Sequence, residues 1–111
     1  MAIQESLIAD RLESLLETQT GDSRIRTLRA CLRDVQKLGL PEFETVIPAA
    51  NEWWKQRNLA IHELVKIEAG GGPTWHARLA CARETALAGV DLYADVKKAS
   101  EKVKRRQRSS A

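Results

Sequence analysis

One stretch of the chain brings together side chains suited to phosphate chemistry. Arg57, Asn58 and His62 lie in the string Trp54-Lys55-Gln56-Arg57-Asn58-Leu59-Ala60-Ile61-His62. An imidazole accepts and donates protons near neutral pH, which suits His62 to acid–base catalysis. A planar guanidinium binds two phosphate oxygens at once, which suits Arg57 to stabilising charge on a phosphate. Because RNA supplies its own nucleophile, the 2′-hydroxyl, these groups are chemically sufficient to cleave it.

The segment that carries these residues is predicted to be a core-facing helix from Pro48 to about Glu68. At about 100° per residue, Asn58 falls inside the apolar arc, with Arg57 near one edge and His62 just beyond the other. Asn58 and His62 are i, i+4 neighbours and are expected to touch. A buried polar group is costly unless it is paired, so such a cluster needs a reason. The apolar arc consists of Ile47, Ala50, Trp54, Ile61, Leu64 and Val65.

A structural explanation of the cluster stays open beside the catalytic one. Arg57 can pair with a carboxylate on another helix while backbone groups satisfy Asn58 and His62. The cluster would then be a buried polar network without chemistry. The carboxylates considered for this pairing are Glu13, Glu17 and Asp91.

The string around Arg57 resembles the signature of the HEPN domain family. That family is marked by an Arg, four to six residues and then a His, with a polar residue, often Asn, directly after the Arg. Here the string is Arg57-Asn58-x-x-x-His62, with Trp54 one turn before the Arg and Ile61 directly before the His. The chain length and the predicted place on the third helix of a bundle agree. The resemblance covers this string closely and the helix layout loosely.

The resemblance implies a fold and a function. HEPN domains are all-helical and are mostly metal-independent endoribonucleases, found as toxins of toxin–antitoxin pairs, as antiphage effectors and as CRISPR-associated nucleases. They usually form dimers in which the Arg and His of both protomers line one cleft. Carried over to this chain, Arg57 would stabilise the scissile phosphate, His62 would act as general base or acid, and Asn58 would orient the imidazole or a phosphate oxygen.

One position departs from the pattern of HEPN toxins paired with a minimal nucleotidyltransferase. In those toxins a Tyr that becomes modified commonly lies two residues after the His. Leu64 occupies that position here, and the chain's only tyrosine is Tyr93. The departure argues against neutralisation by modification at that position, although an antitoxin or nucleotidyltransferase partner stays an expectation.

Apolar periodicity predicts four helices, and therefore an all-α, antiparallel up-and-down bundle of four to five helices. The first ends near Thr18 to Gly21. The second is capped by Asp22 or Ser23 and stopped by Gly39 and Pro41, the third follows Pro48, and the fourth begins near Thr74. Residues 1–96 are expected to form the bundle and residues 97–111 a basic helix end or tail.

Basic residues gather in two places. The last fifteen residues carry seven basic residues and one acidic residue, so their net charge is +6, while the whole chain carries +3. On the predicted second helix, four cations at i, i+3, i+7 and i+11 share one face, and both groups are candidates to bind RNA phosphates. An ordinary solvated face and a solubilising helix end are the alternatives. The candidate RNA-binding residues are Arg26, Arg29, Arg33, Lys37, Lys104, Arg105 and Arg106.

Composition excludes several classes of protein. The chain of 111 residues is 43% apolar and 30% charged, which is typical of one globular domain rather than a disordered segment. No apolar run approaches the roughly 20 residues of a membrane span, and the first ten residues show no signal pattern. Cys31 and Cys81 lie within helical patterns and are expected to be small buried hydrophobes. We therefore expect a cytoplasmic protein without a metal or cofactor.

Two hypotheses of function follow. The first is a dimeric, metal-independent endoribonuclease that acts as a toxin or in antiphage defence, with Arg57, Asn58 and His62 in its active site. The second is a non-catalytic helical adaptor, or a module that binds nucleic acid or a nucleotide.

Overall fold

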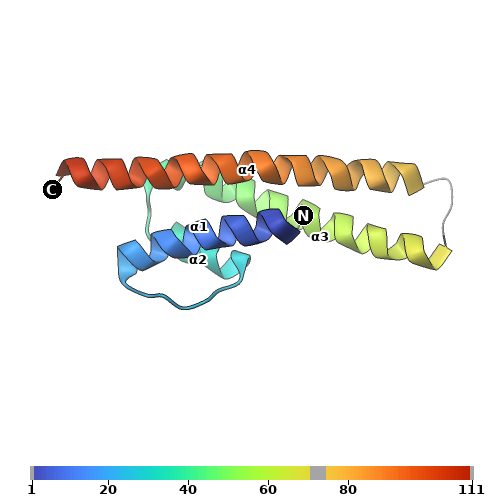
Figure 1. Ribbon diagram of the computed structural model, residues 1–111, viewed down its shortest axis with the longest axis horizontal. Helices are drawn as coiled ribbons and strands as arrows, with labels where there is room; N and C mark the ends of the chain where they lie inside the picture. The colour runs from blue at the N-terminus through green and yellow to red at the C-terminus, as the bar shows by residue number, and fades with distance from the viewer. Residues whose placement is uncertain (1, 71–74, 111) are drawn as a thin grey trace.

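A computed structural model describes the backbone of residues 2–70 and 75–110, and the side chains of residues 3–62 and 76–109. Within those residues the protein is all-α, as predicted, and four helices and one 3-10 turn form a bundle (Figure 1). The predicted start of the fourth helix near Thr74 lies outside the described residues, which resume at Trp75. The elements are α1 (Ala2–Thr20), α2 (Leu28–Lys37), η1 (Pro41–Phe43), α3 (Val46–Gly70) and α4 (Trp75–Ser110).

The helix α1 ends where the sequence predicts. Gly21 has a positive φ of 76° and its N–H donates to the carbonyl of Glu17 at 2.8 Å, which closes the helix with a left-handed residue. Gly39, with a φ of 63°, does the same after α2. These two glycines therefore end the two helices in the first half of the chain.

The helix α2 begins later than predicted. We expected its cap at Asp22 or Ser23, but the N-cap is Thr27, whose hydroxyl accepts from the N–H of Ala30 at 3.2 Å. Ile25 is 93% exposed. The predicted start of the second helix was therefore wrong by several residues.

Carboxylates hold the segment before α2 out of helical conformation. The backbone N–H of Arg26 donates to Glu13 of α1 at 2.9 Å, and that of Arg24 donates to Asp22 at 3.0 Å. These N–H groups are satisfied without a helix, so residues 21–27 return along the bundle as an extended loop. As a result α1 and α2 run in the same direction, and α3 runs opposite to α1, α2 and α4 (Figure 1).

One apolar core joins all four helices. It is centred on α1, α2 and the facing halves of α3 and α4, while the ends of α3 and α4 that meet at residues 70 and 75 extend past α1 and α2 as a helical hairpin (Figure 1). Its fully buried members exclude water and supply most of the stability. The largest are Phe43, Ile8, Leu12, Leu15, Leu16, Leu32, Val35, Val96 and Val103.

The basic C-terminal segment belongs to the bundle. Residues 97–110 continue α4 without a break, and Val103 is fully buried against the core. Gln107 and Gln19 exchange side-chain hydrogen bonds of 2.6 and 2.8 Å, which ties the end of α4 to the end of α1. The expected helix end is therefore packed along much of its length.

The core face of α3 is turned relative to the predicted arc. Ile47 is buried as expected, but Trp54 is only half-buried and Ile61 is 36% exposed, while Leu64 and Val65 lie outside the described side chains. Trp53, which is not part of the predicted arc, is buried at 5% exposure.

The reason is a close approach of α4. The indole N–H of Trp53 donates to the carbonyl of Thr85 at 2.8 Å, and a Cβ on Gly89 would lie 2.8 Å from the indole ring. Only glycine leaves room for the ring at that position. The indole of Trp53, and not that of Trp54, is therefore buried against α4.

Candidate active site and basic groove

The side chain of Arg57 points towards the first turns of α1. Its guanidinium forms an ion pair with Glu5 and donates to Oδ1 of Asn58 at 2.7 Å. The side chain of Arg57 is 19% exposed, and its Nε has no hydrogen-bond partner among the described residues. The pairing expected of a structural network is therefore present, but its acid is Glu5.

The carboxylates expected for that pairing make other contacts or lie elsewhere. Glu13 accepts from the backbone N–H of Arg26. Glu17 and Asp91 are exposed. The sequence pattern missed Glu5 because the register between α1 and α3 is set by packing of the whole bundle.

The imidazole of His62 faces away from the Arg57 pair. His62 is exposed and lies one turn after the half-buried Asn58. Five residues along a helix correspond to a rotation of about 500°, so Arg57 and His62 project about 140° apart around α3. Within one chain, Asn58 lies between the two groups, and the guanidinium and the imidazole do not face a common centre.

His62 ends a polar stripe along α3. Asn51, Lys55, Asn58 and His62 follow one another at spacings of four, three and four residues. This spacing places all four on one face of a helix. Lys55 and His62 are exposed, and Asn51 and Asn58 are half-buried. The stripe follows from helical spacing alone, although the predicted RNA-binding residues do not include Asn51 or Lys55.

A groove between α2 and α3 includes the first two residues of this stripe, Asn51 and Lys55. Its volume is about 640 Å³ and it carries three cations and no carboxylate. The guanidinium of Arg29 lies over the ring of Trp54, 4.7 Å from the ring centroid, and so forms part of the groove wall. The lining residues are Thr27, Arg29, Ala30, Arg33, Gln36, Asn51 and Lys55.

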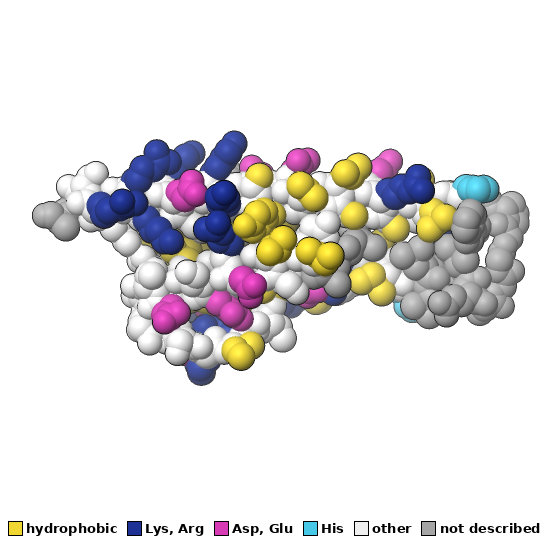
Figure 2. Space-filling model, viewed as in Figure 1, with side chains coloured by type: hydrophobic (Ala, Val, Ile, Leu, Met, Phe, Trp, Pro, Cys, Tyr) yellow, Lys and Arg dark blue, Asp and Glu magenta, His cyan; other side chains and the backbone are white. Residues whose placement is uncertain are grey.

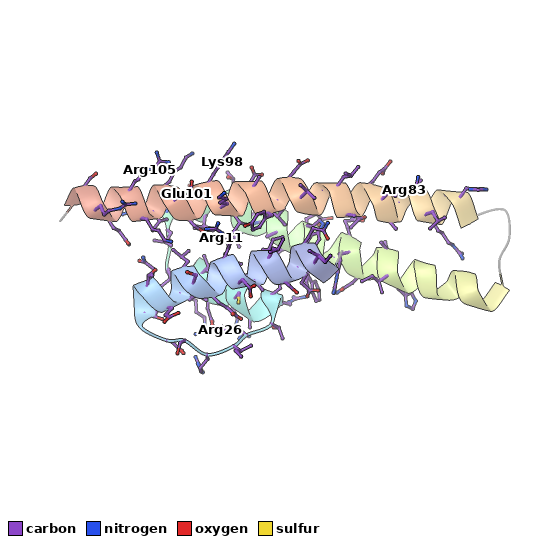
Figure 3. The ribbon with its side chains drawn as sticks, in the orientation of Figure 1. Arg11, Arg26, Arg83, Lys98, Glu101 and Arg105 are labelled. Carbon is purple, nitrogen blue, oxygen red and sulfur yellow. The ribbon has the colours of Figure 1, made fainter. Side chains whose placement is uncertain are left out.

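Of the four cations predicted to share one face of the second helix, two line the groove and two do not. Arg29 and Arg33 line the groove, and Lys37 is exposed in the last turn of α2. Arg26 precedes the helix, and its guanidinium is 8% exposed between Asp22 and Asp34 at 2.9 Å each. Figure 3 places Arg26 on the loop side of α2. Arg26 therefore anchors the loop and does not extend the row.

The three cations predicted to bind RNA at the C-terminal end differ in exposure and in pairing. Arg105 is exposed, Lys104 is half-buried, and the guanidinium of Arg106 donates to Glu42 at 2.9 and 3.1 Å. This hydrogen bond lowers the pKa of Glu42. Figure 2 shows the basic side chains gathered over this half of α4, and Figure 3 shows Lys98 and Arg105 pointing away from the bundle.

The two cysteines lie in different environments, and the described side chains form no cluster of possible metal ligands. Cys31 is buried, and burial raises the pKa of its thiol to about 11, so it is a poor nucleophile. Cys81 is exposed, contrary to the expectation that both cysteines are buried. Residues 3–62 and 76–109 contain no cluster of three or more His, Cys, Asp or Glu arranged to hold a metal ion.

An apolar patch is exposed where α1 begins beside α4. Ile3 and Leu7 of α1 and Leu87 and Val90 of α4 are between 42% and 74% exposed. Arg11 contacts the hydroxyl of Tyr93 at 3.4 Å, one turn further along both helices, so Leu7 and Val90 are neighbours. Figure 2 shows apolar side chains exposed where α1 begins beside α4.

Comparison with known proteins finds no match to a family model, to a curated protein or to a solved structure. Among the described residues, no helix is both long and apolar enough to cross a membrane.

Proposed function

We propose that this protein is a metal-independent endoribonuclease, similar in its motif to HEPN domains, whose active site is completed across a homodimer. The observation that carries the proposal is the exposure of His62 on the same face of α3 as Asn58, at the end of the stripe that borders the basic groove. An imidazole in that place is open to solvent and to a strand lying along the groove.

The proposed reaction needs only proton transfer and charge stabilisation. One imidazole accepts the proton of the 2′-hydroxyl while its oxygen bonds to phosphorus, and the bond from phosphorus to the 5′-oxygen breaks. A water molecule protonates that leaving oxygen and regains a proton from the imidazolium, so each site needs one imidazole. Arg57 stabilises the charge on the non-bridging oxygens, and Asn58, which already contacts Arg57, keeps the guanidinium in place.

A second copy of the chain would supply what one chain lacks. Each chain has one His in the motif, and its Arg57 projects about 140° away from it. In a two-fold dimer, each cleft takes groups from both chains. The exposed apolar patch of Ile3, Leu7, Leu87 and Val90 is the surface most suited to a contact between two copies.

The test is cleavage of an RNA pool by the purified protein in EDTA, with His62→Ala and His76→Ala run in parallel. We expect the wild type and His76→Ala to cut and His62→Ala to be inactive, because only His62 lies in the motif. His76 is also exposed and serves as a matched control. Equal activity of the two variants, or no cutting by any folded protein, would contradict the proposal.

One observation favours the second candidate, a non-catalytic module that binds RNA. The guanidinium of Arg57 is largely enclosed and is already neutralised by Glu5. If that pair is purely structural, the groove and the C-terminal cations would still bind RNA without cutting it. RNA affinity that is unchanged by loss of His62, in a protein that never cuts, would select this function.

The wider role follows only from the motif. A toxin or antiphage role in the cytoplasm, with an antitoxin or a nucleotidyltransferase as partner, is proposed on the resemblance of the Arg57–His62 string. Arrest of growth on expression in a bacterium, relieved by His62→Ala, would support this role. Normal growth with active enzyme present would argue against it.

A further inference from the structure

We infer that the groove between α2 and α3 binds the phosphate backbone of single-stranded RNA and leads the strand towards His62. The binding half of this inference stands on the groove itself, and the direction towards His62 rests on the proposed function.

The charge of the groove favours a polyanion. Arg29, Arg33 and Lys55 line it from two helices, and Thr27, Gln36 and Asn51 add neutral hydrogen-bonding groups. The side chain of Arg33 is 67% exposed and lies 3.9 Å from Asp34, so it is free to turn towards a ligand. The lining from the N-cap Thr27 to Gln36 of α2 covers ten residues, a length of about 13 Å, which gives room for several successive phosphates.

The groove on the other side of α3 has the opposite character. It lies between α3 and α4, has a volume of about 530 Å³ and contains no Lys or Arg in its lining. Its four carboxylates would repel a phosphate chain. They are Glu52, Glu84, Asp91 and Asp95. The sign of the charge therefore selects one side of α3 for RNA, and this is the side on which Asn58 and His62 lie.

The shape of the groove and the planar side chain of Arg29 favour a single strand. A groove between two packed helices admits one backbone, whereas duplex RNA is recognised across its wide minor groove. The guanidinium of Arg29, which lies over the ring of the half-buried Trp54, is the planar group that lines the groove. Unpaired bases stack on such surfaces with little dependence on sequence.

The test is binding of a fluorescent 2′-O-methyl RNA oligonucleotide, which has no 2′-hydroxyl to react, measured by anisotropy at several salt concentrations. Arg33→Glu/Lys55→Glu changes the groove, and Ala80→Glu/Arg83→Glu/Ala94→Glu makes the same total charge change at exposed positions of α4. Figure 3 shows Arg83 far from α2. Circular dichroism checks that both variants are helical.

We expect the groove variant to bind at least about tenfold more weakly, with a salt slope shallower by about 1.4 for two lost phosphate contacts. The control variant should stay within about threefold of the wild type, because its charges are screened from the groove. Equal loss in both variants, or affinity of the groove variant within about twofold of the wild type, would overturn the inference.

The outcomes separate this inference from the proposed function. RNA binding that depends on the groove, in a protein that does not cut RNA, would support this inference and contradict the proposed nuclease. Cutting that depends on His62 but is unchanged by Arg33→Glu/Lys55→Glu keeps the nuclease and overturns the groove.

Discussion

Arg57 is the residue on which the choice of function depends. Its guanidinium is bound to Glu5 and Asn58 in the free protein, and a phosphate would have to displace or join that carboxylate. A group that stabilises a phosphate and a group that only links α1 to α3 respond differently when Glu5 loses its charge. The two roles can therefore be separated by one substitution.

We expect Glu5→Gln to tighten RNA binding and to lower the free energy of unfolding by about 1–3 kcal/mol. The loss lies between the values for exposed and buried ion pairs, because both side chains are partly enclosed. Tighter binding follows because the guanidinium gains a free charge for phosphate. Anisotropy with 2′-O-methyl RNA and urea unfolding measure the two effects.

Glu52→Gln is the matched control for Glu5→Gln. Glu52 is exposed and accepts a hydrogen bond from Gln56 on the same helix, so its loss removes one negative charge without touching Arg57. If Glu5→Gln loses stability but binds RNA no better than Glu52→Gln, Arg57 is a structural link between helices.

The sequence located the residues of the motif but not their partners. Types and spacing are enough to bring Asn58 and His62 one turn apart on a helix, and to place Arg57 aside from them. The pairing with Glu5 depends on the register of α1 against α3, which local sequence patterns do not specify. The stripe through Asn51 and Lys55 was readable, since it needs only helical spacing.

At the scale of elements, α3 and α4 are brought together by a small residue facing a large one. Gly89 leaves the space that the indole of Trp53 fills, and the indole N–H is satisfied by a backbone carbonyl of α4. This contact also sets the rotation of α3 about its axis, and therefore the direction in which His62 projects.

We expect Gly89→Ala to destabilise the protein although alanine is the better helix former. The gain in helix propensity is about 1 kcal/mol, but a methyl group 2.8 Å from the indole costs about 1–3 kcal/mol in forced movement. Ala94→Gly, at an exposed position of α4, reports the propensity term alone. Urea unfolding of Gly89→Ala that shows a gain of about 1 kcal/mol would mean that the ring moves aside freely.

A second contact between elements depends on pH. Arg106 holds the carboxylate of Glu42 at the start of η1, and this hydrogen bond lowers the pKa of Glu42 below its ordinary value of 4.5. A lowered pKa in the folded state means that the stabilisation is present above the unfolded pKa and is lost as the pH falls through the folded pKa.

We therefore expect Glu42→Gln to be less stable than the wild type near neutral pH and equally stable in acid. Urea unfolding across a pH series measures the difference, which should shrink once the pH falls below about 4.5. Glu44→Gln removes a neighbouring exposed carboxylate and is the control for net charge. A constant difference at all pH values would show that the effect of Glu42 is not electrostatic.

The elements were predictable to different degrees for a physical reason. The ends of α1 and the presence of α3 and α4 follow from local signals, such as Gly21 after the last turn of α1. The start of α2 is decided by Glu13, which reaches across from α1 to the N–H of Arg26. A contact between residues far apart in sequence overrides a local capping signal, and no local pattern reports it.

At the scale of the whole molecule, charge and apolar surface are separated. The described part of the bundle has a basic groove, an acidic groove, a basic end of α4 and an exposed apolar patch where α1 begins beside α4. An exposed apolar patch on a small protein is a site of association when it covers a few hundred Å².

The composite site can be tested by mixing two inactive variants. If each active site takes Arg57 from one chain and His62 from the other, a heterodimer of Arg57→Ala and His62→Ala retains one intact site. Equal amounts of the two variants should then recover about a quarter of the wild-type sites, since about half of the dimers are mixed. If both groups come from one chain, no mixed dimer contains an intact pair, and activity stays at the level of the separate variants. Leu87→Glu/Val90→Glu should make the protein monomeric in sedimentation and abolish the recovery, whereas recovery without a dimer would contradict the shared site.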